Sequence, residues 1–293
     1  MLESLSHNWL IFNILSSFCV GLFSFFNKVT IERKHNENLT LLFLYGNQIW
    51  IAFMLVLFFG NHSFNSKTFF LATIASLFLL IVYKSRFIAL KNIDSSTYFT
   101  NFRIISSTLL LFIGYLFFND TLSFREIFGF ALGIGIFFLL FEKQKHASNR
   151  HYKKSILALL TSIIFITFFG TILKIVSLGE INFFNFIFYE SIVSLSIMLI
   201  LGRKKISSGL FRKNILLKET FKLSLFQAIL QILIAPLFLY ALYLGADLGI
   251  AYKIQSYSIF IPIILSIIIY KERFTKKKII ALILTIISIQ FFL

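Results

Sequence analysis

Long apolar runs alternate with short polar connectors along the whole chain. The runs do not alternate polar with apolar residues as the strands of a transmembrane β-barrel do. A bilayer core takes about twenty apolar residues per helical crossing, and a helix satisfies its own backbone groups in lipid. The pattern predicts an all-α, polytopic membrane protein of ten transmembrane helices, near residues 9–29, 39–59, 68–89, 96–118, 125–141, 155–177, 182–201, 220–243, 248–270 and 276–293.

The composition excludes a soluble fold. Of 293 residues, 58% are hydrophobic and 14% are charged, whereas about a quarter of the residues in a soluble domain are charged. The net charge of +16 lies in connectors rather than on an amphipathic face, so we expect a lipid bilayer and a small-molecule substrate as partners, and no nucleic acid. Cys19 stands alone in an apolar run and the five histidines lie in tails or loops, so no metal and no cofactor are expected.

The two halves of the chain repeat each other. A shift of 152 residues aligns several pairs: Ala89-Leu90 with Ala241-Leu242, Ser106 with Ser258, Asp120 with Glu272, Ile127 with Ile279 and Leu132 with Leu284. We therefore expect two five-helix repeats, 1–145 and 146–293. An odd number of helices per repeat inverts the second copy, as in secondary transporters whose site lies between the halves. Asp120 and Glu272 each precede the last helix of a half, where we expect an acid to cap that helix.

The short motifs that flank the helices of these repeats resemble those of a known family. "ALKNID", a helix and "NDTLSFREIFGFALGIGIFFLL" in one half, and "ALYLGAD", a helix and "KERFTKKKIIALILTIISIQFFL" in the other, are similar to the paired domains of the EamA branch of the drug/metabolite transporter superfamily. Lys28 and Lys174 resemble a lysine common in that branch. The chain departs from it at Asp120, where glutamate is usual, and at Asn47 and Glu190, where an arginine is frequent nearby. The resemblance implies a metabolite transporter.

Lysine and arginine are distributed unevenly between the two sides of the predicted bundle. They crowd into the connectors after the first, third, fifth, seventh and ninth helices, whereas the opposite connectors hold only Lys67 and Arg125. The positive-inside rule makes the crowded side cytoplasmic, which places both termini on the extracytoplasmic side of the cell (inner) membrane. Members of the resembled family usually have cytoplasmic termini, so the charge pattern predicts an orientation that differs from theirs.

Three charged residues lie deep within predicted spans: Arg103, Glu190 and Lys253. A charge at the bilayer centre costs on the order of 3 kcal/mol, so such residues face a cavity or a partner. Helical spacing puts Arg103 on one face with other polar groups, and the helix over 220–243 carries a similar polar stripe. The predicted substrate-binding residues are Arg103, Lys253, Glu190, Thr100, Asn101, Tyr98, Gln227, Gln231, Ser256 and Asn47.

Two interpretations of these charges stay open. Arg103 and Glu190 could form a structural ion pair. Alternatively, Arg103 and Lys253 contact substrate; because one acid cannot neutralise two bases, the surplus favours an anionic or zwitterionic solute such as an amino acid. Glu190, the acid buried well within a span, is the candidate for proton coupling unless a base holds it ionised.

Basic residues near helix ends have simpler explanations. Lys28 and Lys174 lie within about a turn of an end, where a long side chain can reach the headgroups, although a cavity role stays open. Lys84 and Arg86, at the end of the third span, are expected at the membrane interface.

Taken together, the residues predict a secondary active transporter, monomeric or homodimeric, that works by alternating access. We find no HExxH, GxSxG or Walker motif, so neither an enzyme nor an ATPase is expected. The alternatives are a membrane-embedded enzyme of lipid or isoprenoid metabolism, and a channel or structural subunit.

Overall fold

The chain is helical throughout the part that the structure describes. The computed structural model describes residues 8–61, 63–120, 123–140, 149–179, 181–210, 214–271 and 275–291, and no strand occurs in these ranges. The elements, in order, are α2 (Asn8–Glu32), α3 (Glu37–Phe59), α4 (Ser66–Leu90), α5 (Ser95–Phe118), α6 (Phe124–Leu140), α7 (Asn149–Leu178), α8 (Phe183–Leu210), α9 (Asn214–Tyr243), α10 (Leu248–Gln255), the 3₁₀ segment η1 (Ser256–Ile259), α11 (Phe260–Tyr270) and α12 (Lys276–Gln290).

The prediction of an all-helical, multi-pass membrane protein is confirmed. Among the described residues, eight helices are long and apolar enough to cross a membrane, counting α10, η1 and α11 as one. The apolar stretches of α6 and α12, Ile127–Ile136 and Ile279–Ser288, are shorter. Large apolar side chains such as Trp50 and Phe58 point outward, with 69% and 78% of their surface exposed. Lipid tails accept such groups, because the tails are as apolar as the side chains.

Local signals define the helix ends. The side chain of Asn36 accepts hydrogen bonds from the second and third backbone N–H groups of α3, at 3.0 and 3.2 Å. Asn182 does the same for α8, at 3.0 and 3.1 Å. Asn119 and Lys271 adopt left-handed backbone angles, with φ of 56° and 52°, and end α5 and α11. These are common ways to satisfy the unpaired groups of a helix terminus.

The ninth predicted span, residues 248–270, is interrupted at η1, between α10 and α11. Pro262 has no N–H to donate to the carbonyl of Ser258, which accounts for the 3₁₀ geometry just before it. α2 approaches this break closely at Gly21, where an added Cβ would lie 2.8 Å from the carbonyl oxygen of Ser258. A glycine is therefore required for this contact.

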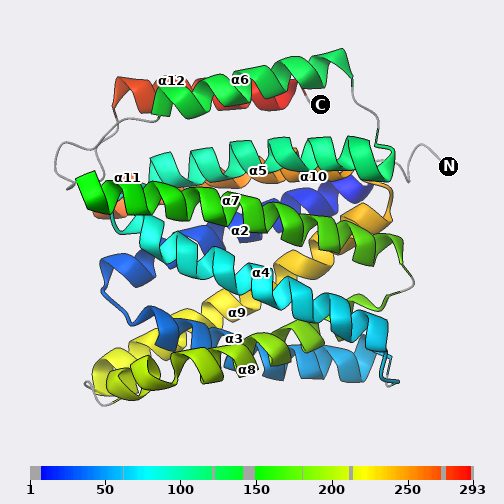
Figure 1. Cartoon of the computed structure of the whole chain (residues 1–293), viewed down its shortest axis with the longest axis vertical. Helices are drawn as coiled ribbons and strands as arrows, with labels where there is room; N and C mark the ends of the chain where they lie inside the picture. The colour runs from blue at the N-terminus through cyan, green and yellow to red at the C-terminus, as the bar shows by residue number, and fades with distance from the viewer. Residues whose placement is uncertain are drawn as a thin grey trace.

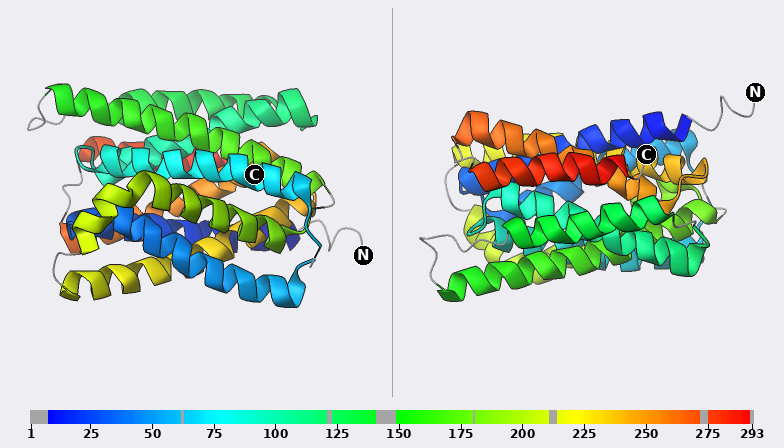
Figure 2. Two further views of the ribbon diagram at one scale, coloured as in Figure 1. Left: turned by 60° about the horizontal axis from the view of Figure 1, so that its bottom comes forward. Right: turned by 90° about the horizontal axis from the view of Figure 1, so that it is seen from above.

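The helices lie side by side in layers (Figure 1). α3 packs against α8 at one edge of the bundle, and α6 packs against α12 at the other (Figure 1). Between these pairs lie α4 against α7, α2 against α9, and α5 against α10. The two additional views show the same side-by-side arrangement (Figure 2). Ser288 of α12 donates to the carbonyl of Gly129 in α6 at 2.7 Å, so this glycine serves helix packing within the chain.

Three helices extend further than their apolar runs. α7 begins at Asn149 rather than near 155, α8 continues to Leu210 rather than 201, and α9 begins at Asn214 rather than near 220. The added residues are the basic, polar ends of the connectors. Hydropathy marks only the lipid-contacting part of a helix, whereas backbone hydrogen bonding continues beyond it.

Candidate functional site

A cavity of about 90 Å³ lies between the helices of the bundle, enough for a few water molecules or a small ligand group. Both halves of the chain line it. Its polar and charged members are Ser24, Gln48, Tyr83, Arg86, Arg103, Glu190, Gln231, Tyr252 and Gln255, and its rings and aliphatic groups are Val20, Phe23, Leu79, Ile166, Phe169, Leu173, Phe186, Ile187, Ile234, Ala235 and Phe238. A mostly apolar cavity with a few converging polar groups is typical of a ligand site.

Arg103 enters the cavity from α5 with 7% of its surface exposed. It donates from Nη1 to Oε1 of Gln255 at 3.1 Å. These two residues are 152 positions apart, the same shift that aligns the repeats. Gln255 in turn donates to the hydroxyl of Ser16 on α2 at 3.2 Å. The guanidinium is thus oriented by neutral groups of the other half and of α2.

Arg86 lines the cavity, whereas the sequence had led us to expect it at the membrane interface. Only 5% of its surface is exposed. Its guanidinium carbon lies 5.5 Å from the ring centroid of Tyr83 and 5.1 Å from that of Phe102. Stacking on rings suits the planar, weakly hydrated guanidinium. Rings of its own helix and of α5 therefore enclose the guanidinium of Arg86.

Glu190 is buried in α8 with 4% of its surface exposed. Gln48 of α3 donates to its Oε2 at 3.3 Å, and Ser194 donates to its Oε1 at 3.1 Å. Arg103 lies across the same cavity but bonds to Gln255 instead. The interpretation of Arg103 and Glu190 as a structural ion pair is therefore wrong for this conformation, because neutral partners satisfy each group separately.

The remaining predicted site residues divide into two groups. Gln231 lines the cavity with Arg103 and Glu190. The others lie outside its lining: Lys253, Thr100, Asn101, Tyr98, Gln227, Ser256 and Asn47. All of these are buried except Asn47, which is partly exposed. Some of them join helices, since Tyr98 donates to Ser162 at 3.1 Å and Gln227 donates to Asn27 at 3.2 Å.

Sequence reasoning missed Gln48, Tyr83, Arg86, Tyr252 and Gln255 as members of the cavity. One signal was available for Gln48, because Leu44, Gln48 and Ala52 recur every four residues and are all buried. The burial of Arg86 has no signal in its local sequence.

Lys174 is buried among polar groups of one end of the bundle and does not reach the headgroups. Its Nζ donates to the carbonyl of Ala246 at 2.9 Å and lies 3.7 Å from Oδ1 of Asp120. Oδ2 of Asp120 accepts from the backbone N–H of Leu248 at 2.9 Å. Asp120 therefore caps α10 of the other half instead of α6, the helix that follows it. Lys28 is likewise buried and pairs with Glu32 at 2.8 Å, and Glu272 lies outside the described residues.

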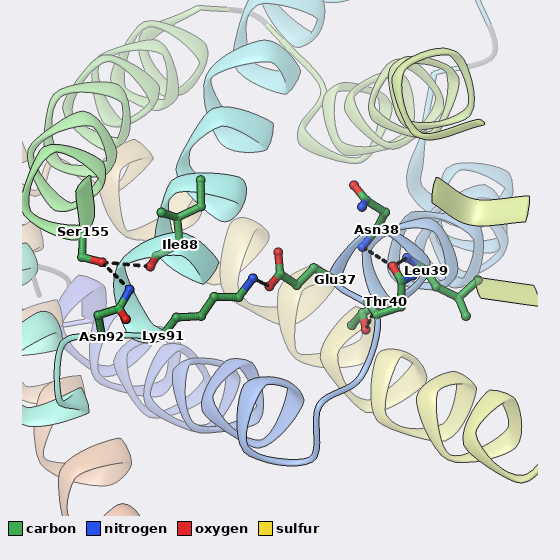
Figure 3. Close-up of polar contacts among 9 residues, drawn as sticks. Glu37, Asn38, Leu39, Thr40, Ile88, Lys91, Asn92 and Ser155 are labelled. Carbon is green, nitrogen blue, oxygen red and sulfur yellow. Dashed lines mark hydrogen bonds and ion pairs between the residues drawn. The ribbon is translucent and has the colours of Figure 1, made fainter. Parts of the chain in front are cut away.

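The turn between α4 and α5 is fixed by polar contacts to two neighbouring helices (Figure 3). Lys91 pairs with Glu37 of α3 at 2.6 Å, and Asn92 donates to the hydroxyl of Ser155 on α7 at 2.9 Å (Figure 3). Beside this turn lies a more polar pocket of about 310 Å³, which Lys28 and Glu32 of α2 also line. Polar groups thus surround the space at this end.

Residues 153–293 match the sequence profile of the EamA-like transporter family. The second half of the chain belongs to this family. The EamA resemblance read from the sequence is confirmed for this half, and membership indicates a membrane transporter of the drug/metabolite superfamily rather than an enzyme. No curated protein sequence matches the chain. A solved crystal structure that is 13% identical, with a TM-score of 0.59, covers 92% of this chain and 96% of its own chain, and shows that the EamA-like chain shares a whole fold with it.

Proposed function

We propose that this EamA-like protein is a secondary active transporter that carries a small anionic or zwitterionic metabolite by alternating access. The observation that carries the proposal is the cavity, which combines two buried arginines and a buried glutamate with aromatic walls. Charged groups are costly in a membrane protein and mark solute pathways. The apolar walls favour a solute with an apolar part, such as a neutral amino acid.

Two inverted repeats, 1–145 and 146–293, would provide the ten spans that this mechanism needs. Helix contacts support the repeat, since exchanging the halves converts the α4–α7 contact into α9–α2, and α3–α9 into α8–α4. Helix caps support it too. Asn36 and Asn182 cap equivalent helices, and Asn119 and Lys271 end equivalent helices in the left-handed conformation.

The predicted site residues have different roles in this proposal. Arg103, Glu190 and Gln231 contact the solute, because they line the cavity. The other predicted residues lie outside the lining and would join the site only after a conformational change: Lys253, Thr100, Asn101, Tyr98, Gln227, Ser256 and Asn47.

Glu190 would carry a coupling proton. Its side-chain partners Gln48 and Ser194 are neutral, so no base among the described residues holds it ionised in this conformation. The transporter would work in a cell membrane as a monomer or homodimer, with both termini outside according to the charge of its connectors.

Counterflow in liposomes tests the proposal. Purified protein should exchange external radiolabelled solute for internal unlabelled solute in a saturable manner, with a panel of neutral amino acids as probes. Glu190→Gln should abolish uptake driven by a pH gradient and spare exchange. Absence of counterflow for the whole panel would contradict transport of this solute class, and unchanged gradient dependence in Glu190→Gln would contradict the coupling role.

A further inference from the structure

Two guanidinium groups that line the cavity lie against one aromatic ring, that of Phe102. The guanidinium carbons of Arg86 and Arg103 lie 5.1 and 5.6 Å from the centroid of the Phe102 ring. Arg86 belongs to α4, whereas Phe102 and Arg103 are adjacent in α5. Both arginines are more than nine-tenths buried and both line the cavity. A single small ligand in this cavity would therefore contact both charges.

The pair lacks a counter-charge among the described residues. No carboxylate of those residues lies within ion-pair distance of either guanidinium, and the nearest cavity acid, Glu190, is bonded to Gln48 and Ser194. Nε of Arg86 is buried and has no hydrogen-bond partner in this part of the chain. Buried donors and buried charges are costly when they lack partners, so such groups point to a ligand.

We propose that Arg86 and Arg103 together form a subsite for a carboxylate group. This inference rests on the proposed transport function and adds to it the position of the anionic group. When Glu190 has released its proton, its carboxylate and the two guanidiniums leave one positive charge in the cavity, which the carboxylate of the solute neutralises. Guanidinium groups match the planar carboxylate, since each can donate two parallel hydrogen bonds. The Phe102 ring and Gln255 hold the two forks in position.

Arg86 is the specificity-determining member of this subsite. Arg103 already donates to Gln255, whereas Nε of Arg86 has its donor available for the ligand. The charge of Arg86 therefore selects solutes with a carboxylate, and its fork geometry sets the affinity. Lysine at this position would keep the charge and lose the fork.

Three related probes isolate the carboxylate: leucine, leucinamide, which lacks the carboxylate, and 4-methylpentanoate, which lacks the amine. Each competes for counterflow and is tested for thermal stabilisation of the purified protein. In the wild type, leucinamide should bind at least about tenfold more weakly than leucine, because the amide lacks the negative charge and one of the two acceptor oxygens that the forks bind. 4-Methylpentanoate should retain most of its competition. A ratio between probes is independent of how much protein folds.

The variants are Arg86→Met, Arg86→Lys and, as a control, Arg125→Gln at an exposed position of α6. Arg86→Met should weaken the binding of leucine on the order of 10- to 100-fold, and it should bring the ratio of the affinities for leucine and leucinamide close to one. Arg86→Lys should restore much of the ratio at lower affinity, and Arg125→Gln should match the wild type.

Two results would overturn the subsite while transport stands: leucinamide competing as well as leucine in the wild type, or an unchanged ratio in an Arg86→Met protein that still exchanges solute. If no amino acid gives counterflow and no probe stabilises the wild type, the proposed function fails instead.

Discussion

The contact of Asp120 with the second half of the chain can be tested by removing its charge. Asp120→Asn keeps an oxygen that can accept from the N–H of Leu248 but removes the negative charge 3.7 Å from Nζ of Lys174. The side chains of Lys174 and Asp120 are only 7% and 10% exposed. Truncating a buried ion pair costs about 3 to 5 kcal/mol when the remaining charge has no partner.

The expected cost for Asp120→Asn is smaller, about 1 to 2 kcal/mol, because Lys174 keeps its bond to the Ala246 carbonyl and because 3.7 Å is a long ion pair. Asp120→Ala also leaves the N–H of Leu248 without an acceptor, which adds about 1 kcal/mol. Each kcal/mol corresponds to roughly 2 to 4 °C in melting temperature for a chain of this order of size.

Thermal unfolding in detergent at one fixed heating rate measures these shifts, since membrane proteins unfold irreversibly. The matched control is Glu37→Gln, which breaks the exposed pair with Lys91, whose side chain is 53% exposed. That change should cost about 1 kcal/mol or less. Equal losses for Glu37→Gln and Asp120→Asn would refute the reasoning. So would strict additivity of Asp120→Asn and Lys174→Met, because paired charges must couple.

Three further predictions use other parts of the molecule. Gly249→Ala should destabilise the protein by about 1 to 3 kcal/mol in thermal unfolding, because the added Cβ would lie 2.7 Å from the Cα of Leu111. Gly46→Ala is the control and should be neutral or stabilising, because an added Cβ there meets nothing within 4 Å. A larger loss for Gly46→Ala than for Gly249→Ala would contradict the helix packing. Burial lowers the pKa of His35, so its contribution to stability should be full above about pH 6.5 and fall as the pH drops below that value. His35→Gln should flatten this part of the profile of melting temperature against pH. Identical profiles for the variant and the wild type would contradict this role of His35. An N-terminal tag should react with an impermeant label in intact cells, because the charge pattern predicts termini outside the cell. A tag that is protected from the label there would contradict this orientation.

Local sequence was sufficient for the residues whose position depends on one helix alone. The apolar runs located the helices because lipid requires about twenty apolar residues per crossing. The polar faces of α5 and α9 identified Arg103 and Gln231, and its depth within an apolar span identified Glu190; these three do line one cavity. The 152-residue shift also aligned Arg103 with Gln255, its hydrogen-bond partner.

Other residues depend on which helix becomes a neighbour. Arg86 lies near the end of an apolar run and so resembles an interfacial residue, yet Tyr83 and Phe102 enclose it. Asp120 precedes α6 in sequence and caps α10 in space. Lys253 is as deep in sequence as Arg103 but lies outside the cavity lining.

The sequence by itself determined that this is a helical membrane protein with a duplicated pattern, because hydropathy, caps and charge act within single helices and their connectors. Only the tertiary structure decided which polar groups share the cavity. Helix rotation and crossing set that choice, and they depend on side-chain packing between helices distant in sequence, as in the approach of Gly249 to Leu111 and of Arg86 to Phe102.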